Sequence, residues 1–197
     1  MSENSIIEIL NSISAKLEQA TATEEQNLIR LLSQFAMMQD YLQVDMSFAV
    51  RIANQNSNGF LCMLSFTYEV HSHKTPQSKH QFSEFELVGI AILKNDYGHT
   101  FIQPETIADK INELFDKVEL DFECDKIFSS KFYVLSDEEE KFRASCTPGF
   151  MKAIRKAGEI HIEILGRTLL VRYRKSYTPE IGRKLHEFIC AISASGI

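Results

Sequence analysis

The sequence predicts a mixed α+β fold in which an antiparallel sheet carries packed helices and is preceded by an N-terminal helical hairpin. Apolar residues recur at helical spacing in the first 42 residues and at every second position in several later segments. These segments follow one another without the regular βαβ alternation of a parallel sheet. We therefore expect residues 1–42 to form the hairpin and residues 43–197 the α+β body, joined as one continuous domain.

The hairpin is predicted from two amphipathic segments. Apolar side chains repeat at helical spacing over residues 6–17 and again over residues 28–42, the second time after Thr23 and Gln26, which have the spacing of a capping box. The short connection near residues 20–22 favours antiparallel neighbours. We expect the hairpin to pack on the body, with association between two copies as the alternative.

A meander of three antiparallel strands is predicted next. Residues 44–52, 60–70 and 82–93 are rich in aromatic and β-branched side chains, and the first of them alternates apolar and polar positions. Residues 54–59 and 95–98 supply the turn chemistry.

Helices and strands are interleaved in the rest of the chain. Pro104 suits the first turn of a helix that extends to about residue 117. The Gly166-Arg167 pair fits a two-residue turn between alternating strands. The remaining expected elements are strands at 118–124, 132–135, 160–164 and 169–173 and helices that begin at Ser136, Thr147 and Thr178.

Composition indicates a cytoplasmic, globular protein. The chain has 197 residues, 44% of them apolar, and no apolar run approaches the roughly 18 residues of a membrane span. The N-terminus lacks the basic region of a signal peptide. Four cysteines lie far apart without a CxxC motif and are expected to be reduced, buried thiols.

The charge of this acidic protein is unevenly distributed. The net charge is −6, yet residues 1–140 contain 10 basic and 23 acidic side chains, whereas residues 141–184 contain 11 basic and 3 acidic ones. The two regions can meet within the fold or across a homodimer, and the basic region can also contact phosphate groups.

The basic region provides the first candidate site. Arg172 and Arg174 are expected on one face of a strand, with Lys175 and Arg155 on flanking elements that could converge around them. These residues form a candidate site for an anionic ligand or for nucleic acid, although Tyr173 is expected on the opposite face and the isoelectric point is about 5.5. Solvated or ion-paired surface is the favoured interpretation.

The second candidate site is a histidine cluster. His71 and His73 would point the same way from an extended segment, and His80 could complete a metal site with an open position. Cys146, between two cations and just before a helix start, is the candidate reactive thiol. The sequence contains neither a glycine-rich nucleotide loop nor a serine elbow, so we expect no cofactor and assign no catalytic residue.

Part of the chain, from about residue 100 to 192, carries a set of short motifs. They are Phe101 with Pro104-Glu105, Leu120-Asp121-Phe122, Phe128-Ser129, Phe132-Tyr133-Val134-Leu135-Ser136-Asp137-Glu138, Arg143, Thr147-Pro148-Gly149-Phe150, Glu163 with Leu169-Leu170-Val171-Arg172, and Pro179-Glu180. Together they resemble a family of uncharacterised prokaryotic proteins, a domain of unknown function. Members often look like membrane-anchored proteins with a soluble α+β portion. The family has no assigned activity, so the resemblance transfers no catalytic residue.

These observations favour binding over catalysis. The first hypothesis is a non-enzymatic binding or assembly protein that engages a protein partner or a second copy of itself. The alternative is a binder of nucleic acid or another anionic ligand through the basic C-terminal face. An enzyme centred on Cys146 or on the histidine cluster is the less favoured third reading.

Overall fold

The computed structural model describes residues 17–52, 59–71, 79–105, 118–120, 122, 125–175 and 177–194. Their strands are β1 (Leu17–Gln19), β2 (Gln43–Ile52), β3 (Gly59–His71), β4 (Lys79–Ile92), β5 (His99–Pro104), β6 (Val118–Glu119), β7 (Phe132–Ser136), β8 (His161–Leu165) and β9 (Thr168–Arg172). Their helices are α2 (Ala22–Leu32), α3 (Ala36–Gln39), α4 (Lys126–Ser129), α5 (Glu139–Ser145), α6 (Pro148–Ala157) and α7 (Pro179–Ala194).

All nine described strands belong to one antiparallel sheet, in the order β1-β2-β3-β4-β9-β8-β5-β7-β6. The predicted mixed α+β class with an antiparallel sheet is therefore confirmed. The meander is confirmed for β2, β3 and β4. Beyond β4 the order departs from a simple meander, because the C-terminal β8–β9 hairpin inserts between β4 and β5.

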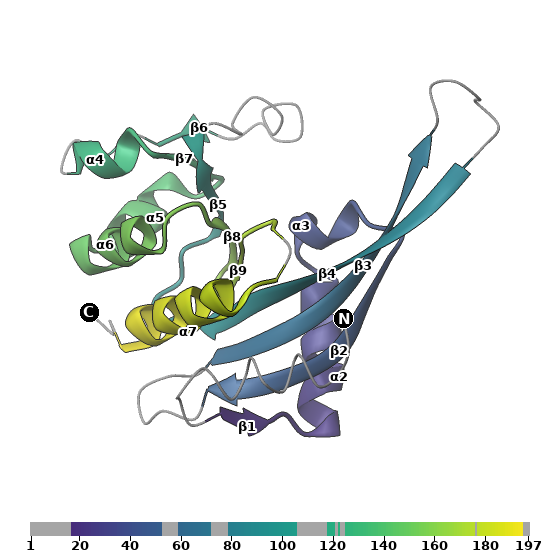
Figure 1. Ribbon diagram of the computed structural model, residues 1–197. Helices are drawn as coiled ribbons and strands as arrows, with labels where there is room; N and C mark the ends of the chain where they lie inside the picture. Colours follow the sequence, from purple (N-terminus) through teal and green to yellow (C-terminus); the bar gives the residue numbers. More distant parts are fainter. Residues whose placement is uncertain are drawn as a thin grey trace.

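Helices cover both faces of the sheet, as Figure 1 shows. Helices α4 to α7 pack on one face, where β3 contributes Leu61 and Met63, and helices α2 and α3 pack on the other, where β3 contributes Cys62 and Leu64. Successive strand residues point to opposite faces. The central strands are therefore apolar on both sides, which explains why their sequences show long apolar runs.

Helix α7 approaches the sheet at two glycines. A Cβ atom added at Gly89 would lie 2.5 Å from Cδ1 of Ile189 and 2.8 Å from Cγ1 of Val171, and one added at Gly59 would lie 2.5 Å from Cγ2 of Ile189. Real Cβ atoms do not come this close to other carbons. The absence of side chains at these two positions lets Ile189 rest directly on the strands.

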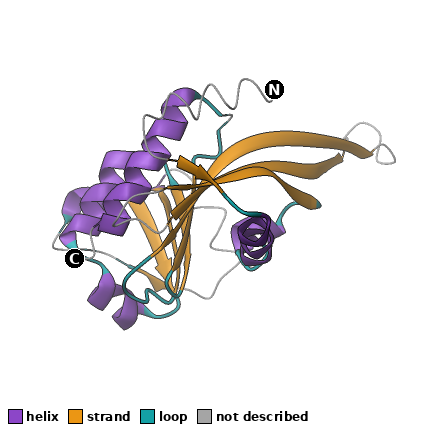
Figure 2. Ribbon diagram, turned by 90° about the horizontal axis from the view of Figure 1, so that it is seen from below, coloured by secondary structure: helices purple, strands orange, loops and turns teal. Residues whose placement is uncertain are grey.

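Three long strands continue past the rest of the sheet as an arm, which is clear in Figure 2. β4 pairs with β9 only over Gly89–Ile92, and β2 pairs with β1 only over Val50–Ile52. The remaining parts of β2, β3 and β4 pair with one another. This arm therefore has two edges without a neighbouring strand among the described elements.

The N-terminal hairpin is only partly testable, because residues 1–16 lie outside the described residues. Leu17–Gln19 forms strand β1, so the predicted first helix does not extend to residue 17. The predicted second helix, with its apolar face over residues 28–42, is present only in part, because α2 ends at Leu32 and the separate short helix α3 follows. The capping box of α2 is formed by Thr21 and Glu24, and not by Thr23 and Gln26, because Thr21 is the extended residue whose hydroxyl accepts from the Glu24 N–H.

Around Pro104 the prediction is wrong. Pro104 ends strand β5 and pairs with Phe132 of β7, and the rest of the expected helix, residues 106–117, lies outside the described residues. Ser136 likewise belongs to β7, and α5 begins after Glu138. The β8–β9 hairpin and the threonine-proline starts of α6 and α7 are confirmed. Over the described residues, no helix is long and apolar enough to cross a membrane.

Candidate functional site

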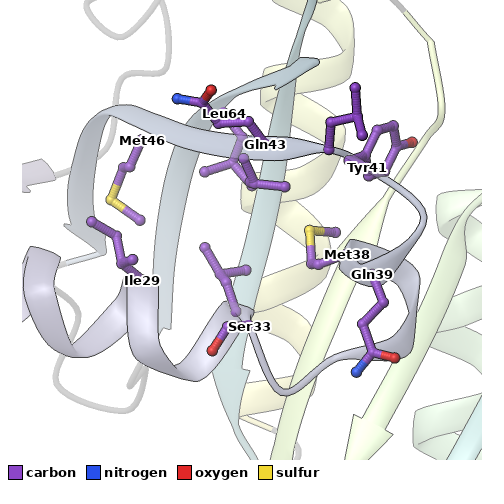
Figure 3. A pocket seen from close by; sticks show the side chains of 11 residues that line it. Ile29, Ser33, Met38, Gln39, Tyr41, Gln43, Met46 and Leu64 are labelled. Carbon is purple, nitrogen blue, oxygen red and sulfur yellow. The ribbon is translucent and has the colours of Figure 1, made fainter. Parts of the chain in front are cut away.

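An apolar pocket lies between the α2–α3 side of the molecule and strands β2 and β3, and Figure 3 shows it from close by. Ile29 of α2 and Met46 of β2 face each other at one end, and Met38 of α3 lies toward the other. The pocket has a volume of about 260 Å³. Pockets for drug-sized ligands usually measure about 300 to 1,000 Å³, so this one suits a few side chains better than a nucleotide.

The lining of the pocket is mostly apolar, and its polar members carry amide or hydroxyl groups. Its lining residues are Ile29, Leu32, Ser33, Met38, Gln39, Tyr41, Leu42, Gln43, Val44, Met46 and Leu64. None of them is a carboxylate, histidine, cysteine, lysine or arginine. Ile29 and Leu42 are large apolar residues that remain 48% and 58% exposed. The pocket offers apolar surface to a partner and no group for acid–base or nucleophilic chemistry.

A buried ionic cluster lies next to the pocket and contacts one of its lining residues. Arg172 is fully buried, and its guanidinium donates to both carboxylate oxygens of Glu86, at 2.7 and 3.0 Å. It also donates to the hydroxyl of Tyr41 at 2.8 Å and to the carbonyl of Met37 at 3.4 Å. Because Tyr41 lines the pocket, this cluster connects the pocket wall to strands β4 and β9.

The charge on Arg172 is maintained by these partners. Burial acts against the charged form, but the hydrogen bonds and the attraction of Glu86 outweigh it and raise the pKa of Arg172. The guanidinium also stacks over the rings of Phe66, at 4.7 Å, and Tyr41, at 5.4 Å. Arg172 is therefore a structural cation and does not present its charge to an external ligand.

A second buried carboxylate anchors α3. Glu163 of β8 is fully buried and accepts from the backbone N–H groups of Ala36 and Met37, at 2.9 and 2.8 Å. Its side chain also contacts Nε2 of His99 at 2.9 Å. Helix α3 has no side-chain cap of its own at Phe35, so Glu163 satisfies its first N–H groups. The C-terminal hairpin thus holds α3 through Glu163 and Arg172.

His161 lies beside the ionic cluster and is neutral. It sits opposite Arg172 in the β8–β9 register and is only 4% exposed. Burial, followed by repulsion from Arg174 and Arg172, lowers the pKa of His161 to about 4. Arg174 itself is exposed and is the one described non-glycine residue with a positive φ, at 50°. The chain turns away from the sheet at this residue.

The four predicted anion-binding residues do not gather on one exposed face. Arg172 is buried, Lys175 pairs with Glu159, and Arg155 lies 3.2 Å from Asp125 near α4. Arg174 alone combines exposure with a position beside Arg172. Neighbouring carboxylates also pair with five other cations of this region, namely Lys141, Arg143, Lys156, Arg183 and Lys184. The basic C-terminal region is therefore largely neutralised locally.

The histidine cluster falls mostly outside the described side chains. His71 ends β3 opposite Lys79, the first residue of β4, and His80 is the register partner of Val70. His73 lies outside the described residues. Over the part of the chain that the structure describes, no group of three or more His, Cys, Asp or Glu residues could hold a metal ion. Metal binding by these histidines stays a prediction.

Cys146 packs as part of the structure. It follows α5 and its half-buried side chain packs against the core beneath α4 to α7. The nearby Arg143 guanidinium pairs with Glu139 and lies 5.3 Å from the Phe122 ring. Of the cysteines expected to be buried thiols, Cys62 is buried, Cys146 and Cys190 are half-buried, and Cys124 lies outside the described residues. Burial raises the pKa of Cys62.

Sequence reasoning did not identify the buried pair Glu86 and Arg172 or the anchor Glu163. The sequence favoured a solvated or ion-paired surface for Arg172, because polar and apolar residues alternate along this strand. The number of predicted helices could have indicated this burial. Two layers of helices cover both faces of the central strands, so polar residues on either face become buried.

No known protein family, curated protein or solved structure matches the chain. The resemblance over residues 100–192 therefore stays a prediction, and the function is inferred from the pocket and its surroundings.

Proposed function

We propose that this chain is a non-enzymatic binding protein that takes apolar side chains of a protein partner into the pocket between α2, α3, β2 and β3. The observation that carries the proposal is the chemistry of the pocket. Its lining contains no charged, histidine or cysteine side chain, and Ile29 and Leu42 stand exposed at its rim. Exposed apolar surface beside a pocket is typical of protein interaction sites.

The wall of the pocket supports the same proposal. The pocket residues Met38, Tyr41 and Leu42 belong to α3 or directly follow it, and α3 is held by Glu163 and Arg172. A wall fixed by buried ionic hydrogen bonds loses little conformational entropy when a partner binds. The pocket wall is thus preorganised, with its binding conformation already formed in the free protein.

The proposal is tested with single substitutions at the rim. Leu42→Asp places a charge where a partner's apolar side chains would lie, and it should abolish capture of the partner by the tagged full-length chain. Ile127→Asp on α4 is the matched control, because Ile127 is a similarly exposed apolar residue at 56% and lies away from the pocket. Partners captured equally by the wild type, Leu42→Asp and Ile127→Asp proteins would overturn the proposal. Light scattering shows whether the partner is a second copy.

A further inference from the structure

Part of one edge of β2 lies beside the pocket and has no strand next to it in the described part of the chain. β1 reaches only Val50–Ile52, and Ala20 adds one backbone hydrogen bond to the carbonyl of Ala49. Residues 43–48 have no strand on this side among the described elements. We call this stretch the open half of β2.

The open half of β2 has backbone groups that can pair. The N–H of Leu42 donates to the carbonyl of Thr67, toward β3. The Thr67 carbonyl therefore points toward β2, and Thr67 is the register partner of Gln43. Because the hydrogen-bonding direction alternates along an antiparallel strand, the backbone groups of Gln43 and Asp45 point toward β3, and those of Val44 and Met46 point away from it. A bulge between Met46 and Phe48 then interrupts the register and limits the stretch available to a new strand.

The two faces of this stretch differ in chemistry. Val44 and Met46 line the apolar pocket. Asp45 projects to the opposite face, where Nε2 of Gln43 donates to both of its carboxylate oxygens, at 3.0 and 2.9 Å. Asp45 has no described ion-pair partner and is exposed. A strand laid along this edge would therefore meet apolar surface on one face and a carboxylate on the other.

We propose that the open half of β2 accepts an extended segment of a protein partner, which joins the sheet as an additional strand. This proposal rests on the proposed function of the pocket. The segment has apolar side chains at alternate positions, directed toward Val44 and Met46, and lysine or arginine side chains between them, beside Asp45. Strand addition gains its affinity from backbone hydrogen bonds and its specificity from these alternate side chains.

The charge of Asp45 favours a basic segment over a second copy of β2 as the strand that binds to this edge. The antiparallel register that pairs residues 43–47 of two copies places Asp45 directly opposite Asp45, and like charges in that position are destabilising. A basic segment replaces this repulsion with attraction. The partner is accordingly a different chain that presents a basic, alternating strand.

Short peptides test the chemistry directly. The probes are nine-residue peptides with blocked ends, one alternating valine and lysine, one alternating valine and glutamate, and one valine–lysine peptide with alternate backbone nitrogens methylated. We expect the valine–lysine peptide to bind the full-length chain in fluorescence anisotropy about two- to fivefold more tightly than the valine–glutamate peptide for each charge contact. Methylation should abolish binding because it removes the backbone donors.

A charge reversal keeps the test independent of folding. Asp45→Lys should invert the preference between the two charged peptides, whereas Glu140→Lys, which makes the same change on an exposed position of α5, should leave it unchanged. Absence of peptide binding, equal binding of the methylated peptide, or an unchanged preference in Asp45→Lys would each overturn strand addition. If a partner is lost in Leu42→Asp but bound normally by Asp45→Lys, the pocket function stands and strand addition fails.

Discussion

At the scale of single residues, Arg172 joins three parts of the molecule that are far apart in sequence. Its guanidinium contacts Glu86 of β4, Tyr41 of the pocket wall and the carbonyl of Met37 in α3. Removal of one partner from a buried ion pair leaves the other charge unpaired, whereas replacement of both by apolar groups can be nearly neutral. The pair therefore fixes positions more than it adds net stability.

Arg172→Met should lower the free energy of unfolding by about 3 to 5 kcal/mol, because Glu86 is left buried without its partner. The double variant Arg172→Met with Glu86→Leu should recover most of this loss. Urea unfolding of the wild type, both single variants and the double variant provides the measurement. A double variant as unstable as Arg172→Met alone would contradict the explanation.

His161 makes stability depend on pH. The folded protein keeps His161 neutral down to about pH 4, while the unfolded chain binds the proton near pH 6.5. Its contribution is therefore fully present above about pH 6.5 and is lost as the pH falls toward 4. From pH 7.5 to 4.5 the wild type should lose roughly 2 to 3 kcal/mol more than His161→Leu. Equal losses in urea unfolding of the two proteins would show that His161 does not act this way.

The sequence could not place these residues, for a physical reason. The alternation of Arg172 with Tyr173, and of Glu163 with Ile162 and Ile164, is the pattern of a strand with one wet face. It becomes buried only because α2 and α3, more than 120 residues earlier in the chain, cover that face. Such coverage is a long-range property that local periodicity does not contain.

At the scale of elements, helix α3 is stabilised by its contacts with the sheet. It has only four residues, far fewer than an isolated helix needs to be stable in water. The Glu163 carboxylate accepts from its first two N–H groups, and Arg172 donates to the carbonyl of Met37. The shape of the pocket is therefore determined by the β8–β9 hairpin as much as by α3.

Glu163→Gln should weaken this anchor. An amide presents one acceptor oxygen in place of two, so one buried N–H of α3 loses its partner at a cost of about 1 to 3 kcal/mol. Denaturant unfolding gives the total loss, and hydrogen exchange at Ala36 and Met37 should accelerate. The control Glu159→Gln, in an exposed pair with Lys175, should change neither quantity. Normal exchange in Glu163→Gln would exclude the anchoring role.

The contact of α7 with the sheet predicts a coupled pair of substitutions. Gly89→Ala should cost about 1 to 3 kcal/mol because the new methyl group overlaps Cδ1 of Ile189. Ile189→Val removes that carbon, so the double variant should be more stable than the sum of the two single losses implies. Thermal or urea unfolding of the four proteins gives the coupling energy, and strict additivity would argue against the contact.

Elements with strong local signals were predictable. The β8–β9 hairpin has a glycine-containing turn between alternating strands, and α6 and α7 begin with a threonine cap followed by proline. β5 was missed because Pro104 has the features of a helix start, whereas its place at the end of a strand depends on pairing with Phe132. The pocket was missed entirely, since it is formed by elements brought together only in the fold.

At the scale of the whole molecule, the two helical layers share one sheet. Figure 1 shows α2 and α3 on the opposite side of the strands from α7, and the β2–β4 strands contribute side chains to both cores. The ionic cluster adds direct bonds between α3 and the C-terminal hairpin. Residues 17–42, the described part of the predicted N-terminal unit, thus meet the described part of the body through an apolar layer and buried charges.

This arrangement predicts that residues 43–197 will not fold independently. Without α2 and α3, the core residues Leu64 and Phe66 would be exposed, and Arg172 and Glu163 would lose partners from α3 and the segment that follows it. The fragment should bind a hydrophobic dye and lack a cooperative unfolding transition. The full-length chain should instead unfold in a single transition that circular dichroism and tyrosine fluorescence report at the same midpoint. A fragment with a sharp transition and no dye binding would show that the first 42 residues form a separable unit.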